Sequence, residues 1–408
     1  MNHDTTNHVN PPNWLLITFD QWRGDWLHQD WLNVPSILQI ASQGWDIRRC
    51  YTSSPQCIPA RASWITGLKP SQLGVTSNQV FTLPSDSPSF VRELKNSYGY
   101  HTRLIGKTHW TPHEKGVDLR DNISLLRDLG FDKAREIAGP RALGVLDCEL
   151  TDVWREEGVL ELYRNDLLRR YSNSIVHDTN PTPLPDHLYP DIWLGNVALE
   201  EISDLPRDTP WFFWISFSGP HEPFDVPTSW RGFHGLIPSP ELRPDSLEQL
   251  NKYAPRGSVL SRKLQRWPDG IPLASVSALR ADYADHMHLL DAQVGRIMRS
   301  LEVNGFLDNT AITICSDHGE LLGDWGLLLK GCFLEGAIRS LFVHKPARAR
   351  QGLRHLRKYE KRPFGLTEAL WSAFYSIVDP SRGSFGRILS STDKCVKIEF
   401  EDEIMLIS

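Results

Sequence analysis

The sequence predicts an α/β protein whose central sheet is mainly parallel and is covered by helices on both faces. Short apolar runs, WLLITF at 14–19 and WFFWISF at 211–217, are typical of strands inside a sheet. Between such runs the spacing of apolar residues favours helices, and this alternation is typical of parallel strands joined by crossover helices. Ionisable residues follow several of the strands, which predicts a site at the carboxyl edge of the sheet.

Local signals place the individual elements. Pro35 suits a first helical turn and Gly44 suits the position past the last one, so a helix is expected over residues 35–43. The clearest helix covers residues 277–303, because its apolar residues recur at spacings of three and four. Other helices are expected over 60–65, 89–97 and 367–377, and other strands over 102–105, 311–315, 396–400 and 404–407.

Two stretches rich in proline, residues 177–191 and 219–274, interrupt the alternation. Long loops in a compact domain usually cover a site or form an insertion, and we expect both stretches to be loops of this kind. We expect residues 1–345 to form the main α/β domain and residues 346–408 to form a small C-terminal subdomain with α+β character.

Composition excludes several classes of protein. Of the 408 residues, 40% are hydrophobic and 23% are charged, which is typical of a globular chain. The net charge of −6 offers no positive footprint for nucleic acid, and no run approaches the ~20 apolar residues of a membrane span. Residues 1–12 lack the basic start and apolar run of a secretory signal. We therefore expect a cytoplasmic protein that binds neither nucleic acid nor membrane.

Ionisable residues gather just after the expected strands or in the loops that leave them. They are Asp20, Lys107, His109, His221, Asp317 and His318. A single aspartate after a strand is usually a turn or cap residue, and a single histidine is usually structural. Because parallel strands bring their carboxyl ends to one edge of a sheet, the whole set predicts a shared site.

The segment Cys57-Ile58-Pro59-Ala60-Arg61 has three interpretations. A free cysteine is a common core residue. A thiol at a helix start is a candidate nucleophile, since the helix dipole lowers its pKa. The third interpretation is that C-x-P-x-R resembles the sequence at which sulfatases are modified, where the cysteine is oxidised to formylglycine. On this interpretation, we expect Cys57 to lie in an exposed turn to which a modifying enzyme binds before folding is complete.

Further motifs carry the same resemblance. Residues 99–109, GYHTRLIGKTH, are similar to the second sulfatase signature, G-x-x-T-x-x-x-G-K-x-H. The strand ending in Asp20 resembles the family's first metal-ligand strand, and residues 220–224, PHEPF, its central histidine loop. Residues 316–330 resemble its last metal and lysine block. These motifs follow the family's order across roughly residues 13–345. The chain therefore resembles the formylglycine-dependent sulfatases of the alkaline-phosphatase-like superfamily.

The resemblance implies an alkaline-phosphatase-like fold and hydrolysis of small-molecule sulfate esters. It implies one divalent cation, calcium by preference and manganese or magnesium as alternatives, because the ligands are mostly oxygen atoms. The implied ligands are Asp20, Gln21, Asp317, His318 and the group at position 57. That group would be formylglycine, made from Cys57 by a formylglycine-generating enzyme, and its hydrate would be the nucleophile.

The resemblance also implies roles for the other site residues. Arg61 would hold the hydrate, and Lys107 and Lys330 would neutralise sulfate oxygens. His109 would remove the proton whose loss expels sulfate and restores the aldehyde. His221 and Lys330 would protonate the leaving alcohol as general acids.

Two departures keep alternatives open. Many sulfatases have Asp-Asp and Asp-Asn where this chain has Asp20-Gln21 and Asp317-His318, a combination that resembles phosphonate monoester and phosphodiester hydrolases and choline-sulfatase-like enzymes. Lys107 and His109 favour the interpretation as a sulfatase. Only residues 331–408 follow the last motif, so the C-terminal region is shorter than is usual in the family. This second departure motivates a further alternative, a non-catalytic relative that binds an anion.

Overall fold

The computed structural model describes residues 11–172, 178–237, 246–348, 363–378, 387–392, 395–400 and 403–407. Its helices are α1 Pro35–Ala41, α2 Cys57–Thr66, α3 Phe90–Tyr98, α4 Ile123–Asp128, α5 Glu149–Glu156, α6 Leu160–Ser172, α7 Pro190–Ser203, α8 Ser246–Tyr253, α9 Val259–Arg266, α10 Leu273–Val303, α11 Glu335–Ile338 and α12 Leu366–Val378. Its strands are β1 Asn13–Phe19, β2 Trp45–Asp46, β3 Cys50–Tyr51, β4 His101–Gly106, β5 Lys133–Glu136, β6 Trp211–Ser216, β7 Thr310–Ser316, β8 Arg339–Ser340, β9 Phe342–Lys345, β10 Phe364–Gly365, β11 Arg387–Thr392, β12 Cys395–Phe400 and β13 Glu403–Ile407.

A central sheet of seven strands has the order β2-β9-β7-β1-β6-β4-β5. The five strands from β7 to β5 run parallel, and only β9 and β2 pair in the antiparallel sense. In this register Leu16 lies opposite Trp214 on one side and Thr313 on the other. The expected mainly parallel sheet is confirmed. Two smaller sheets have the strand orders β10-β3-β8 and β11-β12-β13.

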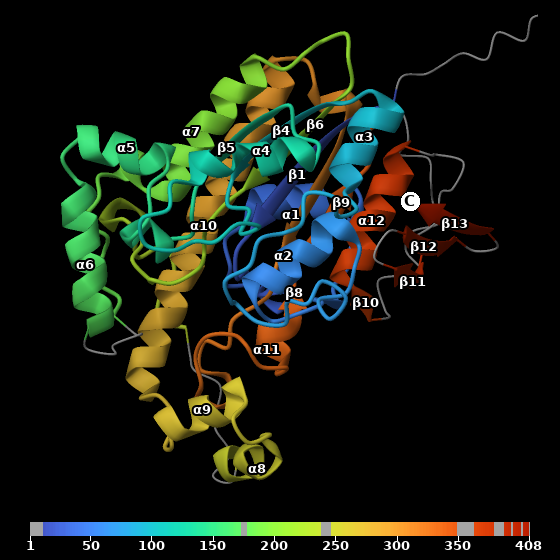
Figure 1. Ribbon diagram of the computed structural model, residues 1–408. Coiled ribbons are helices and arrows are strands. Elements are labelled where there is room, and N and C mark those ends of the chain that lie inside the picture. The colour runs from blue at the N-terminus through green and yellow to red at the C-terminus, as the bar shows by residue number, and fades with distance from the viewer. Residues whose placement is uncertain are drawn as a thin grey trace, which may run out of the picture.

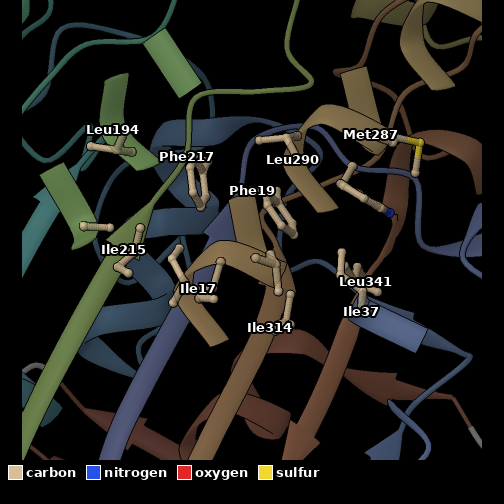
Figure 2. Packing of buried hydrophobic residues seen from close by; sticks show 14 of the residues in the cluster. Ile17, Phe19, Ile37, Leu194, Ile215, Phe217, Met287, Leu290, Ile314 and Leu341 are labelled. Carbon is tan, nitrogen blue, oxygen red and sulfur yellow. The ribbon is translucent and has the colours of Figure 1, made fainter. Parts of the chain in front are cut away.

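Helices cover both faces of the sheet, as the sequence predicts (Figure 1). Successive residues of a strand point to opposite faces. Ile17 and Phe19 therefore pack with α1, α7 and α10 in one apolar cluster, shown in Figure 2. Trp14 and Leu16 pack with α2, α3 and α12 in the second cluster. Both faces of the central strands are buried, which accounts for their nearly continuous apolar sequences.

Three expectations about helices need correction. Helix α2 begins at Cys57, not at residue 60, because Pro59 lies in the first turn, where its missing N–H is not needed. Helix α10 begins at Leu273, directly after Pro272. The stretch 219–274 also contains α8 and α9, whose bounds fit between the prolines of that stretch. Prolines mark the ends of helices there as well as loops.

Helix α12 packs directly on α2, where the indole N–H of Trp371 donates a hydrogen bond of 2.9 Å to the carbonyl oxygen of Trp64. The division of the chain into domains 1–345 and 346–408 stays a prediction. Part of the expected C-terminal subdomain, including residues 349–362, lies outside the described residues. Within the described ranges, no helix has the length and apolar character needed to cross a bilayer.

Strand β9 carries a buried histidine that should make stability depend on pH. Burial, together with the charge of the neighbouring Lys345, lowers the pKa of His344 to about 3. Its Nδ1 lies 2.8 Å from the hydroxyl of Thr313. The unfolded state takes up a proton near pH 6.5 and the folded state does not. The stability that neutral His344 provides is therefore complete above pH 6.5 and is lost as the pH falls toward 3.

We expect His344→Leu to weaken this dependence. Between pH 6.5 and 4.5 the wild type should lose up to about 1.4 kcal/mol per pH unit more than the variant. Urea unfolding at three pH values measures the difference, and parallel stability curves for the two proteins would contradict the assignment.

Candidate active site

The parallel strands bring the expected site residues to one edge of the sheet. Asp20 follows β1, Lys107 follows β4 and Asp317 follows β7, and these three strands share the central part of the sheet. The backbone joins the strand ends directly. The N–H of Asp317 donates to the carbonyl oxygen of Phe19 at 3.2 Å, and the N–H of Asp20 donates to that of Gly219 at 3.0 Å. The strand order and these backbone hydrogen bonds therefore bring the side chains together at one edge of the sheet.

Cys57 is the first residue of α2 and is fully buried, with 0% exposure. Its Sγ lies 3.6 Å from Asp20 Oδ1 and 3.2 Å from His318 Nε2. The expectation of an exposed turn is therefore wrong for the folded chain. Burial works to raise the pKa of the Cys57 thiol, but the charges of Lys107 and Lys330 lower that pKa well below its ordinary value. Helix α2 therefore places the Cys57 thiol next to the charges of Lys107 and Lys330.

Four of the expected metal ligands form one cluster. Ligand atoms of Asp20, Cys57, Asp317 and His318 lie within 4.8 Å of one another, and all four residues are buried. The Nδ1 of His318 lies 2.9 Å from the carbonyl oxygen of Gly319 and donates to it. Nε2 is then the nitrogen with a lone pair facing the cluster. Two carboxylates, one imidazole and the atom at position 57 fit a divalent cation.

Gln21 lies beside this cluster with its amide already bound. Its Nε2 donates to Glu320 Oε2 at 2.6 Å, and its Oε1 accepts a hydrogen bond from Lys330. Its backbone N–H donates to Asp317 Oδ1 at 2.8 Å, from a left-handed φ of 70° that is uncommon outside glycine. Gln21 thus connects the cluster to Lys330 and Glu320, and its role as a metal ligand stays a prediction.

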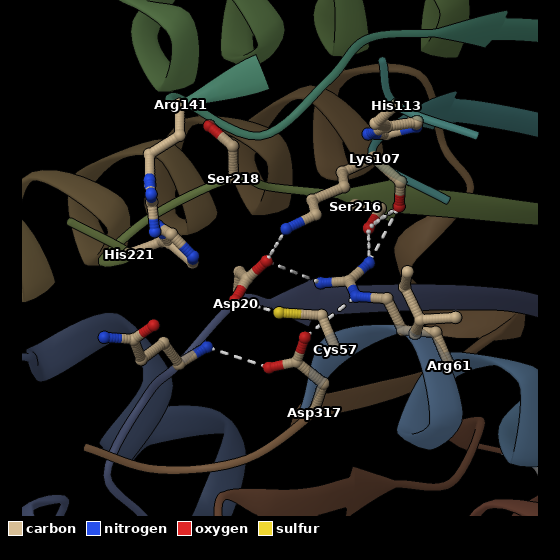
Figure 3. A network of polar contacts seen from close by, with 12 residues as sticks. Asp20, Cys57, Arg61, Lys107, His113, Arg141, Ser216, Ser218, His221 and Asp317 are labelled. Carbon is tan, nitrogen blue, oxygen red and sulfur yellow. Dashed lines mark hydrogen bonds and ion pairs between the residues drawn. The ribbon is translucent and has the colours of Figure 1, made fainter. Parts of the chain in front are cut away.

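Three cations surround the carboxylates, as Figure 3 shows for two of them. Lys107 pairs with Asp20 Oδ2, and Lys330 Nζ lies 3.9 Å from Asp20 Oδ1. Arg61 Nε donates to Asp317 Oδ2 at 2.8 Å. Burial works to raise the pKa of Asp20, but Lys107 and Lys330 outweigh it and hold that pKa below its usual range. Asp20 therefore remains ionised and can bind a cation.

Arg61 is held more firmly than the sequence suggests. Its Nη1 donates to the carbonyl oxygen of Lys107 at 2.8 Å and to the Ser216 hydroxyl at 2.9 Å. Among the described residues, Nη2 has no hydrogen-bond partner and lies 3.6 Å from Asp20 Oδ2. One donor of this buried guanidinium is thus left for a bound group.

A pocket of about 420 Å³ opens beside Cys57. Its lining includes the expected residues Cys57, Lys107, His109 and His221, together with Asn78, His113 and Arg141. Lys107 and Arg141 bring two positive charges to this lining, against the carboxylate of Glu114. An anionic substrate is the ligand that this lining favours.

Of the three histidines that line the pocket, His109 and His221 are in different settings. Burial lowers the pKa of His109 well below its ordinary value, and His113, stacked on its ring at a centroid distance of 4.3 Å, lowers it further. His109 is therefore neutral and able to accept a proton. His221 Nδ1 lies 2.7 Å from the carbonyl oxygen of Glu222 and donates to it, which leaves Nε2 as its free nitrogen.

Sequence reasoning missed several residues around the site. Glu320 accepts a hydrogen bond from the Gln21 amide. It lies in the motif at residues 316–330, so its place in the sequence indicates a position near the site. His113 and Arg141 reach the pocket from loops with no local pattern. Asp191 and His286 lie in helices whose sequences give no sign of a role near the site.

Comparison with known proteins gives the family. The sulfatase family profile matches residues 12–365. An arylsulfatase of Clostridium perfringens is 26% identical over 84% of this chain and 70% of its own length. A choline-sulfatase of Rhizobium meliloti is 29% identical over 80% of this chain, which spans 61% of that relative.

The fold has matching solved structures. A phosphonate monoester hydrolase of Agrobacterium radiobacter superposes with a TM-score of 0.69 at 20% sequence identity, over 97% of this chain and 89% of that one. This likeness supports the alkaline-phosphatase-like fold. With the profile matching most of the chain and the expected residues gathered at one edge of the sheet, the chain belongs to the sulfatase family.

Proposed function

We propose that this chain hydrolyses sulfate esters of small molecules at the pocket beside Cys57. One observation carries the proposal, namely the buried cluster of Asp20, Cys57, Asp317 and His318 with cations beside it. A sulfate monoester is an anion whose reaction moves negative charge onto the leaving oxygen. A site that combines cations, a candidate nucleophile and two histidines fits that charge movement.

The cluster would hold one divalent cation, with calcium as the best match to oxygen ligands and manganese or magnesium as alternatives. When bound, the cation supplies Lewis acidity and makes an attacking oxygen more acidic. Formylglycine at position 57, formed by a formylglycine-generating enzyme, would supply that oxygen as an aldehyde hydrate. Arg61 Nη2 is the free donor that would orient it, while Arg61 Nε keeps Asp317 in place.

The remaining residues would bind charge and move protons. Lys107 would neutralise sulfate oxygens from one side of Asp20, and Lys330 from the other. Neutral His109 would accept a proton from the group at position 57. His221, with Nδ1 bound to the Glu222 carbonyl, would donate a proton from Nε2 to the leaving alcohol.

Turnover of two substrates tests the proposal. We expect the purified, metal-loaded protein to hydrolyse 4-nitrophenyl sulfate with a kcat/KM about tenfold higher than that for 4-nitrophenyl phenylphosphonate, which is about 1.4 kcal/mol of transition-state stabilisation. The reverse order would support a phosphonate monoester or phosphodiester hydrolase, the alternative that Gln21 and His318 favour. Binding of sulfate without turnover of either ester would support a non-catalytic anion-binding relative.

A further inference from the structure

A buried aspartate and histidine lie directly behind the loop that carries His221. Asp191 belongs to α7 and His286 to α10, and they are 1% and 2% exposed. Asp191 Oδ1 accepts from the backbone N–H of Ser218 at 2.9 Å, from its hydroxyl at 3.2 Å and from the N–H of Gly219 at 3.2 Å. Asp191 Oδ2 accepts from His286 Nε2 at 2.8 Å. Two helices thus grip the start of this loop through one carboxylate.

The loop lies against this pair without space between them. A β-carbon on Gly219 would lie 2.2 Å from His286 Nε2 and 2.4 Å from Asp191 Oδ2, so no side chain fits at that position. On its other side, the Gly219 carbonyl oxygen accepts the N–H of Asp20 at 3.0 Å. The pair therefore fixes the position of the Gly219 peptide, which is hydrogen-bonded to Asp20 of the ligand cluster. His221 follows two residues later in the same loop.

The His221 ring is held by a separate contact. Its Nδ1 bonds the Glu222 carbonyl and lies 3.2 Å from Glu222 Oε2. Glu222 thus fixes how the ring is turned, whereas Asp191 and His286 fix where its backbone lies. Proton donation needs both, because the donor must come within hydrogen-bond distance of the leaving oxygen.

We infer that Asp191 and His286 are positioning residues for the proton transfer that His221 makes to the leaving group. The inference rests on the proposed function, since it takes His221 as the general acid. A carboxylate with four donors around it, all buried, is a stiff support, because breaking any one bond leaves a buried polar group unsatisfied. Neither residue lines the pocket or belongs to the ligand cluster, so the effect is exerted through the loop.

The chain contains a matched control on the same helix. Asp285 of α10 accepts from the backbone N–H of Gly232 at 2.7 Å, from that of His234 at 2.9 Å and from His234 Nδ1 at 2.8 Å. This is also a buried aspartate–histidine pair that holds a loop, but its loop contributes nothing to the pocket or the cluster. Removing Asp285 reports the cost of losing such a pair where no site depends on it.

The experiment compares Asp191→Ala with Asp285→Ala on two substrates. 4-Nitrophenyl sulfate has a leaving group that needs little protonation, and phenyl sulfate has one that needs much. For Asp191→Ala we expect kcat/KM to fall about 100-fold on phenyl sulfate, near the lower end of general-acid effects, and about fivefold on 4-nitrophenyl sulfate. Asp191→Asn, which keeps an acceptor oxygen for the loop, should recover part of the loss. Asp285→Ala should change both values by the same small factor.

Equal losses on the two substrates for Asp191→Ala would overturn the inference, because a merely structural defect does not depend on the leaving group. Should that variant fail to fold, His286→Phe, which removes the N–H donor and keeps an aromatic ring, takes its place. A second readout needs no turnover. Crystal structures of the wild type and His286→Phe should differ in the positions of the Gly219 carbonyl and the His221 ring, and an unmoved loop would refute the inference. A wild type that hydrolyses neither ester would defeat the proposed function, whereas an unmoved loop in an active enzyme would defeat this inference alone.

Discussion

Replacing Cys57 by alanine is expected to abolish ester hydrolysis, with a loss on the order of 10⁴-fold or more, because the nucleophile disappears while the rest of the site stays in place. Cys57→Ser should fold and react, but slowly and for about one turnover. A serine ester has no second hydroxyl through which it can expel sulfate, so water must attack sulfur instead. A burst assay with 4-nitrophenyl sulfate separates the two variants.

The state of the wild-type residue is measured on the same protein. The tryptic peptide 50–61 contains both Cys50 and Cys57. We expect a hydrazine reagent to label an aldehyde at position 57 and the thiol of Cys50 to remain unmodified, so that each peptide carries its own control. An active preparation with two thiols, together with a Cys57→Ser variant at full rate, would contradict the mechanism and would leave a metal-dependent hydrolase with another nucleophile.

Asp317→Asn should remove cation binding and lower kcat/KM by about 10³-fold or more. The carboxylate is part of the ligand cluster, and its Oδ2 accepts from Arg61 Nε at 2.8 Å. An amide at this position loses the charge that a cation requires and sets an N–H donor against a guanidinium donor in one of its two orientations. Calorimetric titration with calcium and turnover after chelation and reloading provide the two measurements.

Asp291→Asn is the matched control for this variant. Asp291 is equally buried, but it accepts from the backbone N–H groups of Ser36 and Ile37 at the start of α1, away from the cluster. Its loss should cost about 1 kcal/mol of stability, the usual effect of a helix cap, and should leave calcium affinity unchanged. Unaltered calcium binding by Asp317→Asn would show that the ion, where it binds, uses other ligands.

The elements that sequence predicts well here are those whose signal is local. Strand β1 and the aspartate at its end follow from an apolar run and the residue after it, and α10 follows from its spacing of apolar residues. Most site residues were found because they belong to short motifs. The start of α2 was misplaced because a proline tolerated in a first turn looks the same in sequence as one that precedes a helix.

The residues that sequence could not supply are those whose roles depend on distant packing. Asp191 and His286 are 95 residues apart, and each reads as an ordinary polar residue in a helix until both meet Gly219. Trp22, Trp26 and Trp110 each lie beside a motif in the sequence, and their near-complete burial away from the pocket lining places them in the core. Such choices are decided by long-range contacts, which leave no periodicity in the sequence.

The burial of Cys57 limits the time during which an enzyme can modify its thiol. In the folded chain Cys57 is fully buried. Strand β7 pairs with β1 in the central sheet, and Asp317 and His318 follow its end beside Cys57. About 250 residues separate Cys57 from β7, and at about 5–20 residues per second a ribosome needs roughly 10–50 s to add them. If Cys57 is converted as proposed, the modifying enzyme must act on the nascent chain within this interval or soon after it. Slowing translation between these two segments should therefore raise the fraction of aldehyde, and a chain that completes its sheet first would keep a thiol that no enzyme can reach.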